Sequence, residues 1–116
     1  MNTDIETIHR LITELLETNI LIIVEGKKDK AALNALGMTN ILILGTIYKT
    51  IEAVKGKEVA LLVDLDLEGK KIYSKLRSEL SQRGVRINNK LRHFLFKTHV
   101  RQIENLAAFL SEQKPE

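Results

Sequence analysis

Apolar residues along the chain fall into two patterns, short continuous runs and stripes spaced three or four positions apart. The runs lie at 20–24, 41–44 and 59–63. A short run that is apolar at every position is typical of a strand buried on both faces of a parallel sheet. The stripes predict helices at 4–18, at 28–36, between Thr46 and Gly56, at 67–82, and from Val100 to Leu110. Strands therefore alternate with helices along the chain.

The segment 86–96 has a less regular pattern. Arg86 to Lys90 is polar, and we expect a loop or the uneven start of a strand there. From Leu91 to Phe96 the side chains alternate between two faces, which predicts a fourth strand. One face would carry Leu91, His93 and Leu95, and the other Arg92, Phe94 and Phe96. His93 would then be a strand residue.

Strands that alternate with helices predict a three-layer α/β/α fold with a parallel four-stranded sheet, because each right-handed crossover places a helix on one face. Ligand sites in such sheets lie at the carboxyl ends of the strands, where the strand order reverses. Glu25 follows the first strand, and Asp64 and Asp66 follow the third. These acids meet only if strands one and three are neighbours, so the expected strand order is 2-1-3-4.

Composition narrows the class of protein. The 116 residues suit one domain over 1–116, with 44% hydrophobic and 28% charged residues. The chain has no cysteine, which excludes disulfides, zinc–thiolate sites and a thiol nucleophile. The apolar runs are too short to cross a bilayer, so we expect no membrane partner and a cytoplasmic location. The formal net charge of +3 is too mild to predict nucleic-acid binding by itself.

The segment from Asp64 to Gly69 carries three acids at alternate positions directly after a buried strand. Carboxylates in that setting repel one another and lose hydration, and a divalent cation is the usual remedy. A calcium-binding hand loop is excluded, because its twelfth position is Lys75 and a strand precedes it. Glycine loops that cradle phosphates or dinucleotides are also missing from the sequence. The acids therefore predict a site for a hard cation.

A second polar turn, from Glu25 to Asp29, follows the first strand. Gly26 would let the chain turn sharply and let a ligand approach closely, and Lys27 and Lys28 would meet phosphate as point charges. The alternative is an ordinary strand-to-helix turn, with Asp29 as a favourable charge at the helix start. The presence of a second acidic strand end favours a site.

The order Val24-Glu25-Gly26-x-x-Asp29, then an apolar strand and Asp64-x-Asp66-x-x-Gly69, resembles the Toprim domain. That family includes topoisomerases, bacterial primases, nucleases, recombination-repair proteins and a ribonuclease that matures ribosomal RNA. The resemblance extends from Leu21 to Leu110. The first motif, together with His93-Phe94-Leu95-Phe96 ahead of a helix carrying Glu104, looks closest to the ribonuclease.

The resemblance implies that Asp64 and Asp66 bind Mg²⁺, and that Glu25 is the general acid or base in phosphodiester cleavage or transfer. This chemistry is sensible, because Mg²⁺ prefers a few carboxylates together with water and substrate phosphate. The secondary site residues are Gly26, Asp29, Glu68 and Gly69.

Two of the secondary residues have a simpler alternative role. Glu68 is either an outer ligand or only a favourable charge in the first turn of a helix. Asp29 is expected to be a helix-start residue with a minor role at the metal.

Four lysines flank the two motifs and are expected to contact phosphates, with ordinary solvated charges as an equal alternative: Lys27, Lys28, Lys70 and Lys71. The chain is thus predicted to be a Mg²⁺-dependent protein acting on RNA or DNA phosphodiesters, nuclease-like or RNA-processing. A second hypothesis is a binding module for nucleic acid or a nucleotide, which works without turnover alongside a protein partner or as a homo-oligomer. A third is an accessory to nucleotidyl transfer.

Side chains that could supply another nucleophile or metal ligand are few. Tyr48 and Tyr73 lie on predicted helices and are expected to be partly buried in the core. The three histidines, His9, His93 and His99, do not have the spacing of a metal-ligating pair. Water is therefore the expected nucleophile.

Overall fold

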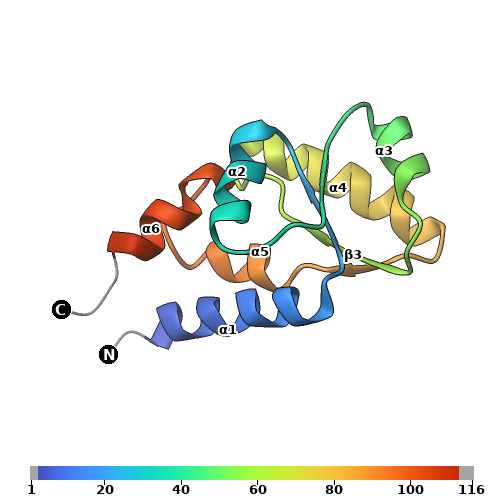
Figure 1. The fold of residues 1–116 in the computed structure, drawn as a ribbon. Helices are drawn as coiled ribbons and strands as arrows, with labels where there is room; N and C mark the ends of the chain where they lie inside the picture. The colour runs from blue at the N-terminus through green and yellow to red at the C-terminus, as the bar shows by residue number, and fades with distance from the viewer. Residues whose placement is uncertain (1–2, 113–116) are drawn as a thin grey trace.

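Four parallel strands form the centre of the protein in a computed structural model, which describes residues 3–112 (Figure 1). The strands are β1 (Leu21–Val24), β2 (Ile41–Ile43), β3 (Glu58–Leu61) and β4 (Arg86–Asn88). Their order is β2-β1-β3-β4, and every neighbouring pair is parallel. The predicted α/β fold and strand order are confirmed. Glu25 therefore leaves β1 beside the end of β3, at the point where the strand order reverses.

Helices cover both faces of this sheet (Figure 1). One core contains apolar residues of α1 (Thr3–Thr18), α2 (Lys27–Ala35), α5 (Lys90–Leu95), η1 (Ile103–Asn105) and α6 (Leu106–Glu112). A second core contains those of α3 (Ile47–Ala53) and α4 (Leu67–Gln82). Ile22 and Val24 of β1 pack into the first core and Ile23 into the second. Both faces of the strand are buried, which explains why its sequence shows no polar alternation.

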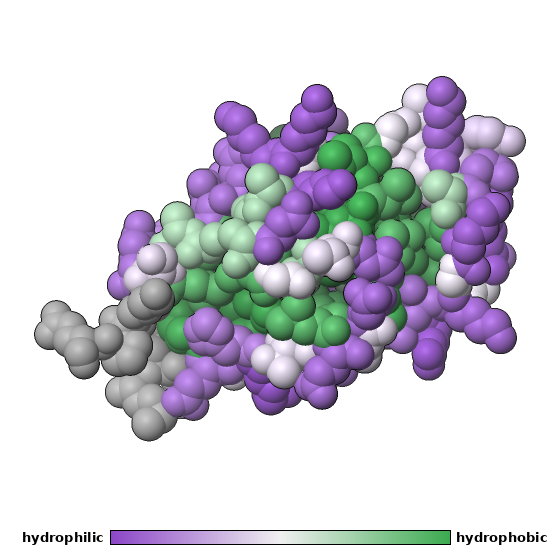
Figure 2. Space-filling view, viewed as in Figure 1, coloured by the Kyte–Doolittle hydropathy of each residue, from purple (hydrophilic) through white to green (hydrophobic). Residues whose placement is uncertain are grey.

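The edge strand β2 is less deeply covered than β1 and β3. All three of its residues are half-buried, whereas β1 and β3 each have three buried residues out of four. Figure 2 shows a band of apolar side chains across the face seen in Figure 1, bordered by hydrophilic groups. Across residues 3–112 no helix is long and apolar enough to cross a membrane.

The predicted fourth strand at 91–96 is wrong. The strand is the shorter β4, and residues 90–95 form the helix α5. Leu91 and Leu95 are 2% and 0% exposed and are four positions apart, a spacing that suits one face of a helix as well as one face of a strand. Because α5 packs against α1, the helical pattern prevails, and His93 is a helix residue.

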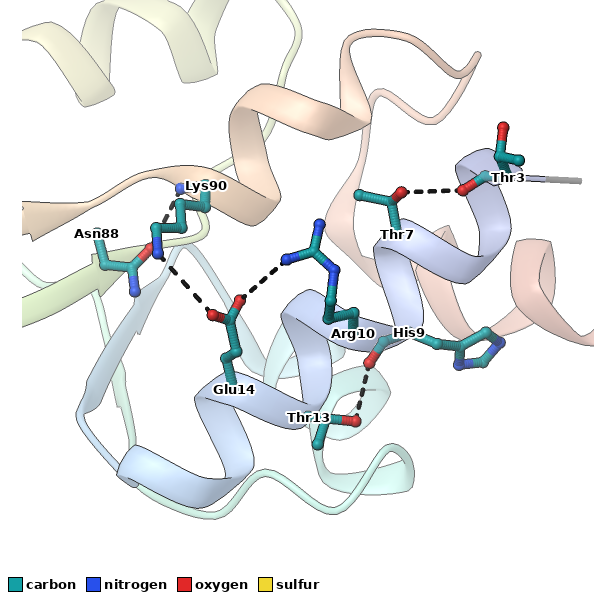
Figure 3. A network of polar contacts seen from close by, with 8 residues as sticks. All are labelled: Thr3, Thr7, His9, Arg10, Thr13, Glu14, Asn88 and Lys90. Atoms are coloured by element: carbon teal, nitrogen blue, oxygen red, sulfur yellow. Dashed lines mark hydrogen bonds and ion pairs between the residues drawn. The ribbon is translucent and has the colours of Figure 1, made fainter.

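An ion pair between Glu14 and Lys90 joins α1 to the start of α5, and a second pair lies within α1 (Figure 3). Glu14 lies 4.0 Å from Arg10 Nη1 and 3.9 Å from Lys90 Nζ. Thr7 and Thr13 donate hydrogen bonds to backbone carbonyls one turn earlier in α1. Exposed pairs of this kind each contribute about 0–1 kcal/mol. The apolar stripe of α1 is therefore the main source of its attachment.

The expectation that both tyrosines are partly buried holds for Tyr73 but not for Tyr48. Tyr48 is 68% exposed, so its predicted core position is wrong. Tyr73 is half-buried, and its hydroxyl accepts a hydrogen bond from Asn89 Nδ2 at 3.0 Å. Its ring also lies against the guanidinium of Arg92, 4.2 Å from Cζ to the ring centroid.

The burial of Leu95 in α5 predicts that shortening this side chain destabilises the protein. Leu95→Ala removes a fully buried side chain and leaves a cavity, so we expect a loss of about 2–5 kcal/mol in the free energy of unfolding. The matched control is Leu67→Ala, since Leu67 is 71% exposed, and its change should stay within about 0.5 kcal/mol. Urea denaturation measures both. Equal midpoints for the two variants would contradict the burial of Leu95.

Candidate functional site

The acids after β1 and β3 are joined by a hydrogen bond across the sheet. Glu25 Oε2 accepts from the backbone N–H of Asp64 at 2.7 Å, although the residues are 39 positions apart. The parallel register places Ile23 opposite Leu61, so the two chains leave the sheet side by side. The convergence predicted for these two acids is therefore observed.

Asp64 is held from several directions. Its Oδ1 accepts a hydrogen bond from the backbone N–H of Ile103 at 2.8 Å. Arg92 donates from Nη2 to the Asp64 carbonyl at 2.9 Å and from Nε to the Val63 carbonyl at 3.0 Å. Two donors of one planar guanidinium thus fix the carbonyls of successive residues, which sets the direction of the chain.

Arg92 is a site residue that the sequence reasoning missed. It is only 3% exposed, because it lies on α5 under the site and against the ring of Tyr73. Burial lowers the pKa of its guanidinium, while the nearby Tyr73, Glu25 and Asp64 raise it. The one available signal is an arginine next to Leu91 in an apolar segment, and that signal does not reveal its partners.

Asp66 begins the helix α4. Its Oδ1 accepts from the backbone N–H of Gly69 at 2.8 Å, the usual bond of an N-terminal capping residue. Its Oδ2 accepts from Gln102 Nε2 at 3.2 Å. Gln102 comes from the segment before η1 and is a second site residue that the sequence does not reveal. Glu68 is exposed in the first turn of α4, where a negative charge is favourable.

Gly69 is required by the close approach of α4 to the end of β3. A Cβ atom at this position would lie 2.0 Å from the carbonyl oxygen of Asp64. No side chain fits there without a shift of the backbone that carries the acid. The motif glycine is thus explained by sterics.

One of the two roles that the sequence suggested for Gly26, allowing a sharp turn, does not require glycine. Its φ of −151° is extended, so the turn after Glu25 does not need the freedom of glycine. A Cβ atom would meet only Asp29 Oδ2, at an ordinary 3.9 Å. Close approach of a ligand to Gly26 stays a prediction.

Asp29 is the most buried acid of the region. It is 6% exposed, and its Oδ2 accepts from the backbone N–H of Gly26 at 3.0 Å. It occupies the first turn of α2, so the structure supports its expected role at the helix start. Burial raises the pKa of its carboxyl, and the charge of Glu104 raises that pKa further.

The acids are electrostatically coupled. Burial raises the pKa of Asp64 to about 6, with further contributions from the charges of Asp29, Glu25 and Asp66. Burial also raises the pKa of Glu25, and the charges of Asp66, Asp29 and Glu68 add to the effect. Backbone hydrogen bonds lower both pKa values but do not outweigh burial. The site therefore favours positive charge or protons.

An open cleft of 430 Å³ contains much of this region. Its lining residues are Glu25, Gly26, Lys27, Lys28, Asp29, Asp64, Gln102 and Glu104. Two of the predicted phosphate-binding lysines thus border the acids. Lys70 and Lys71 line a different hollow along α4. A larger hollow of 640 Å³ includes Lys57 and Leu21, which places it at the amino ends of the strands, away from the acids.

The donor chemistry fits a hard divalent cation. Glu25 and Asp64 each use one carboxylate oxygen for a backbone N–H, and among residues 3–112 the second oxygen of each has no hydrogen-bond partner. No three His, Asp or Glu side chains of that range converge into a ready-made cage. Mg²⁺ does not need one, because it is usually bound by one or two carboxylates with water and substrate phosphate.

Comparison with known proteins finds a family model and relatives that cover most of the chain. The family model described as Toprim domain matches residues 19–89. A Methanocaldococcus jannaschii protein, UPF0292 protein MJ1624, is 36% identical over 101 residues, which cover 79% of each chain. A Methanosarcina barkeri relative, UPF0292 protein Mbar_A0484, is 31% identical, with 93% of this chain and 83% of that protein covered. A solved structure from Aquifex aeolicus has a TM-score of 0.76 and 32% identity, covering 84% of this chain and 95% of that one.

The tight contact at Gly69 predicts a sensitive position. The added methyl group of Gly69→Ala must push the Asp64 carbonyl away. We therefore expect a loss of about 1–3 kcal/mol in the free energy of unfolding. Gly45→Ala is the matched control, because no heavy atom lies within 4 Å of its Cβ position. Chemical denaturation compares the two. If both variants unfold at the same denaturant concentration, the close approach of α4 to Asp64 is wrong.

The raised pKa of Asp64 predicts a pH-dependent stability. The folded state holds this proton more tightly than the unfolded state, so the contribution of Asp64 to stability falls as pH rises from about 4 to about 6. Asp64→Asn keeps an acceptor for Ile103 and removes the charge. In chelator at pH 7 to 8 it should be more stable than the wild type by about 1 kcal/mol, a value reduced by solvent screening.

Thermal unfolding over this pH range tests the effect. The advantage of Asp64→Asn should shrink towards pH 4, where the wild-type carboxyl becomes neutral. Glu17→Gln, at an exposed position of α1, is the control and should follow the wild type at every pH. An advantage for Asp64→Asn that grows as pH falls would contradict the assigned direction of the pKa shift.

Proposed function

The chain belongs to the Toprim domain family, and from that premise we propose that it is a Mg²⁺-dependent enzyme that cuts nucleic-acid phosphodiester bonds. Membership by itself indicates a metal-binding role connected with nucleic acid. The finer proposal is an RNA-processing nuclease, in keeping with the resemblance to the ribosomal-RNA-maturing ribonuclease. A cytoplasmic location would give it access to such substrates.

One observation carries this proposal above the others. Glu25 and Asp64 meet at the switch point of the sheet, joined by the 2.7 Å hydrogen bond, and both have raised pKa values. Perturbed acids that converge in a cleft are typical of functional sites. Asp66 is two residues from Asp64 and contributes to the pKa of both acids.

The residues divide the chemistry among them. Asp64 and Asp66 would hold Mg²⁺, which when bound neutralises charge on the phosphate and lowers the pKa of water. Glu25 would take the proton from the attacking water or return one to the leaving oxygen. Its raised pKa suits proton transfer better than that of an ordinary carboxyl, because efficient acid–base groups have pKa values closer to the working pH.

The lysines of the cleft would place the substrate. Lys27 and Lys28 are exposed and line the cleft with Glu25 and Asp64, so a phosphate there can contact both the ammonium groups and the acidic end of the site. Tyr48 and Tyr73 have no assigned part in the reaction, which leaves water as the nucleophile.

The second candidate is a non-catalytic module that binds nucleic acid or a nucleotide together with a partner. One observation favours it: both carboxylate oxygens of Asp66 are already hydrogen-bonded, to Gly69 and to Gln102. If Asp66 acts mainly as the N-terminal cap of α4, Asp64 is left as the main metal ligand. A protein partner or a second copy of the chain would then complete the function.

The metal hypothesis predicts a difference in Mg²⁺ binding. Calorimetric titration should show tighter binding to the wild type than to Asp64→Asn/Asp66→Asn. Asparagine remains a good helix cap, so the double variant keeps the start of α4 while losing two charges. Equal Mg²⁺ affinity for the two proteins would reject Asp64 and Asp66 as ligands. Glu17→Gln should bind like the wild type.

A cleavage panel then separates the two candidates. Structured RNA, single-stranded DNA and double-stranded DNA are incubated with wild type in Mg²⁺ or in EDTA. We expect Mg²⁺-dependent cleavage of RNA, reduced about 10²–10⁴-fold in Glu25→Gln, which keeps an acceptor for the Asp64 N–H. Cleavage that survives Glu25→Gln removes Glu25 from its catalytic role. Binding without cleavage of any substrate would favour the non-catalytic module.

A further inference from the structure

A cluster of cations surrounds the ring of Phe96, beside the acids. Lys70 Nζ lies 5.5 Å from the ring centroid, Arg92 Cζ 5.4 Å and Arg101 Cζ 5.8 Å. These three residues come from α4, α5 and the segment before η1. Three separate elements therefore bring positive charge to a single aromatic side chain.

The Phe96 cluster, defined as Phe96, Lys70, Arg92 and Arg101, adjoins Asp66. The backbone N–H of Lys70 donates to the Asp66 carbonyl at 2.9 Å in the first turn of α4. Arg101 precedes Gln102, which donates to Asp66 Oδ2 at 3.2 Å. Lys70 is therefore linked to Asp66 by a backbone hydrogen bond, and Arg101 is linked to it through the neighbouring Gln102. The cleft with Lys27 and Lys28, by contrast, contains Glu25 and Asp64.

Within the part of the chain that the structure describes, the two exposed cations of the cluster are not paired with acids. Lys70 and Arg101 are exposed, and among residues 3–112 neither forms an ion pair with a carboxylate. A cation near an aromatic face gains little free energy at an exposed site, and like charges around the same ring repel. An anionic ligand would relieve this repulsion.

The guanidinium of Arg101 is also preorganised for a ligand, because backbone carbonyls hold it in place. Its Nη1 donates to the carbonyls of Thr98 at 2.8 Å and Val100 at 2.9 Å, which fixes the guanidinium and leaves Nε and Nη2 for a ligand. A fixed guanidinium loses little entropy when it binds phosphate, and its planar donors match phosphate oxygens. Arg92, in contrast, is buried and uses its donors on backbone carbonyls.

We propose that Lys70 and Arg101, which both lie near the ring of Phe96, form a phosphate-binding subsite. This subsite would hold the nucleic-acid backbone next to the phosphodiester bond that is cut at the acids. This inference rests on the proposed function and adds a second contact for the substrate, on the Asp66 side of the site. Single-stranded nucleic acid is the favoured ligand, because the half-buried ring of Phe96 offers an apolar surface next to the two cations.

The test measures binding without catalysis. A short fluorescein-labelled single-stranded RNA, and the DNA of the same sequence, are titrated with protein in EDTA, and anisotropy is followed between about 50 and 200 mM salt. Lys70→Gln and Arg101→Gln should each weaken binding several-fold at the lower salt. Each should reduce the slope of log K against log salt by about 0.7, and the double variant by about twice that.

Two further variants make the test specific. Lys57→Gln is the matched control, an exposed lysine at the amino ends of the strands, and should leave affinity and slope unchanged. Phe96→Leu keeps the charges, so it should weaken binding without changing the slope. Circular dichroism checks that each variant is folded.

The outcomes separate this subsite from the catalytic proposal. If Lys57→Gln lowers the slope as much as Lys70→Gln, or if the Lys70→Gln/Arg101→Gln variant binds like wild type, the subsite is rejected even when Mg²⁺-dependent cleavage is found. If binding responds as expected but no substrate is cleaved, the subsite stands and the nuclease proposal fails. A wild type that binds neither oligonucleotide rejects the subsite, and the cleavage panel with structured RNA and duplex DNA then decides the nuclease proposal separately.

Discussion

The hydrogen bonding of partly or fully buried carboxylates to backbone N–H groups is the constraint on which the rest of the site depends. Each of the four acids of the site accepts from a backbone amide: Glu25 from Asp64, Asp29 from Gly26, Asp64 from Ile103, and Asp66 from Gly69. A carboxylate out of water is costly unless it is hydrogen-bonded, and these bonds offset part of that cost. They also connect β1, β3, α2, α4 and η1 around one point.

The remaining electrostatic cost is visible in the pKa values. Burial and neighbouring acids raise the pKa of Asp64 to about 6 and also raise that of Glu25, despite their backbone hydrogen bonds. The positive charge of Arg92 offsets some of the negative charge of the acids. Its guanidinium lies under the site and donates to the Val63 and Asp64 carbonyls. The folded chain therefore carries a group of acids whose charged forms are unfavourable, and the proposed cation would offset that cost. Such a cost is common where a protein prepares a site for binding.

Positive groups border this acidic centre in two places. Lys27 and Lys28 line the cleft with the acids, and the Phe96 cluster lies next to Asp66. A metal ion at the acids and cations around them would together suit a chain of phosphates, which needs one strong interaction at the reacting bond and weaker contacts along the backbone. The proposed nuclease function and the phosphate subsite both follow from this distribution of charge.

The sequence by itself determined the layers, the parallel sheet and the acids at its carboxyl edge. Apolar runs and helical stripes are local patterns, and the turn residues next to them show where each element ends. The strand order 2-1-3-4 was also expected, because it makes strands one and three neighbours and so brings Glu25 beside Asp64. The steric role of Gly69 was not visible in the motif, since it depends on the distance from α4 to Asp64.

Only the tertiary structure decided the rest. Leu91 and Leu95 suit a helix or a strand equally well, and packing against α1 selected the helix α5. That helix places Arg92 under the site and Phe96 beside Lys70. Ile103 and Gln102 reach the acids from 39 and 36 positions away. No local pattern encodes such contacts, because their partners become neighbours only when the chain has folded.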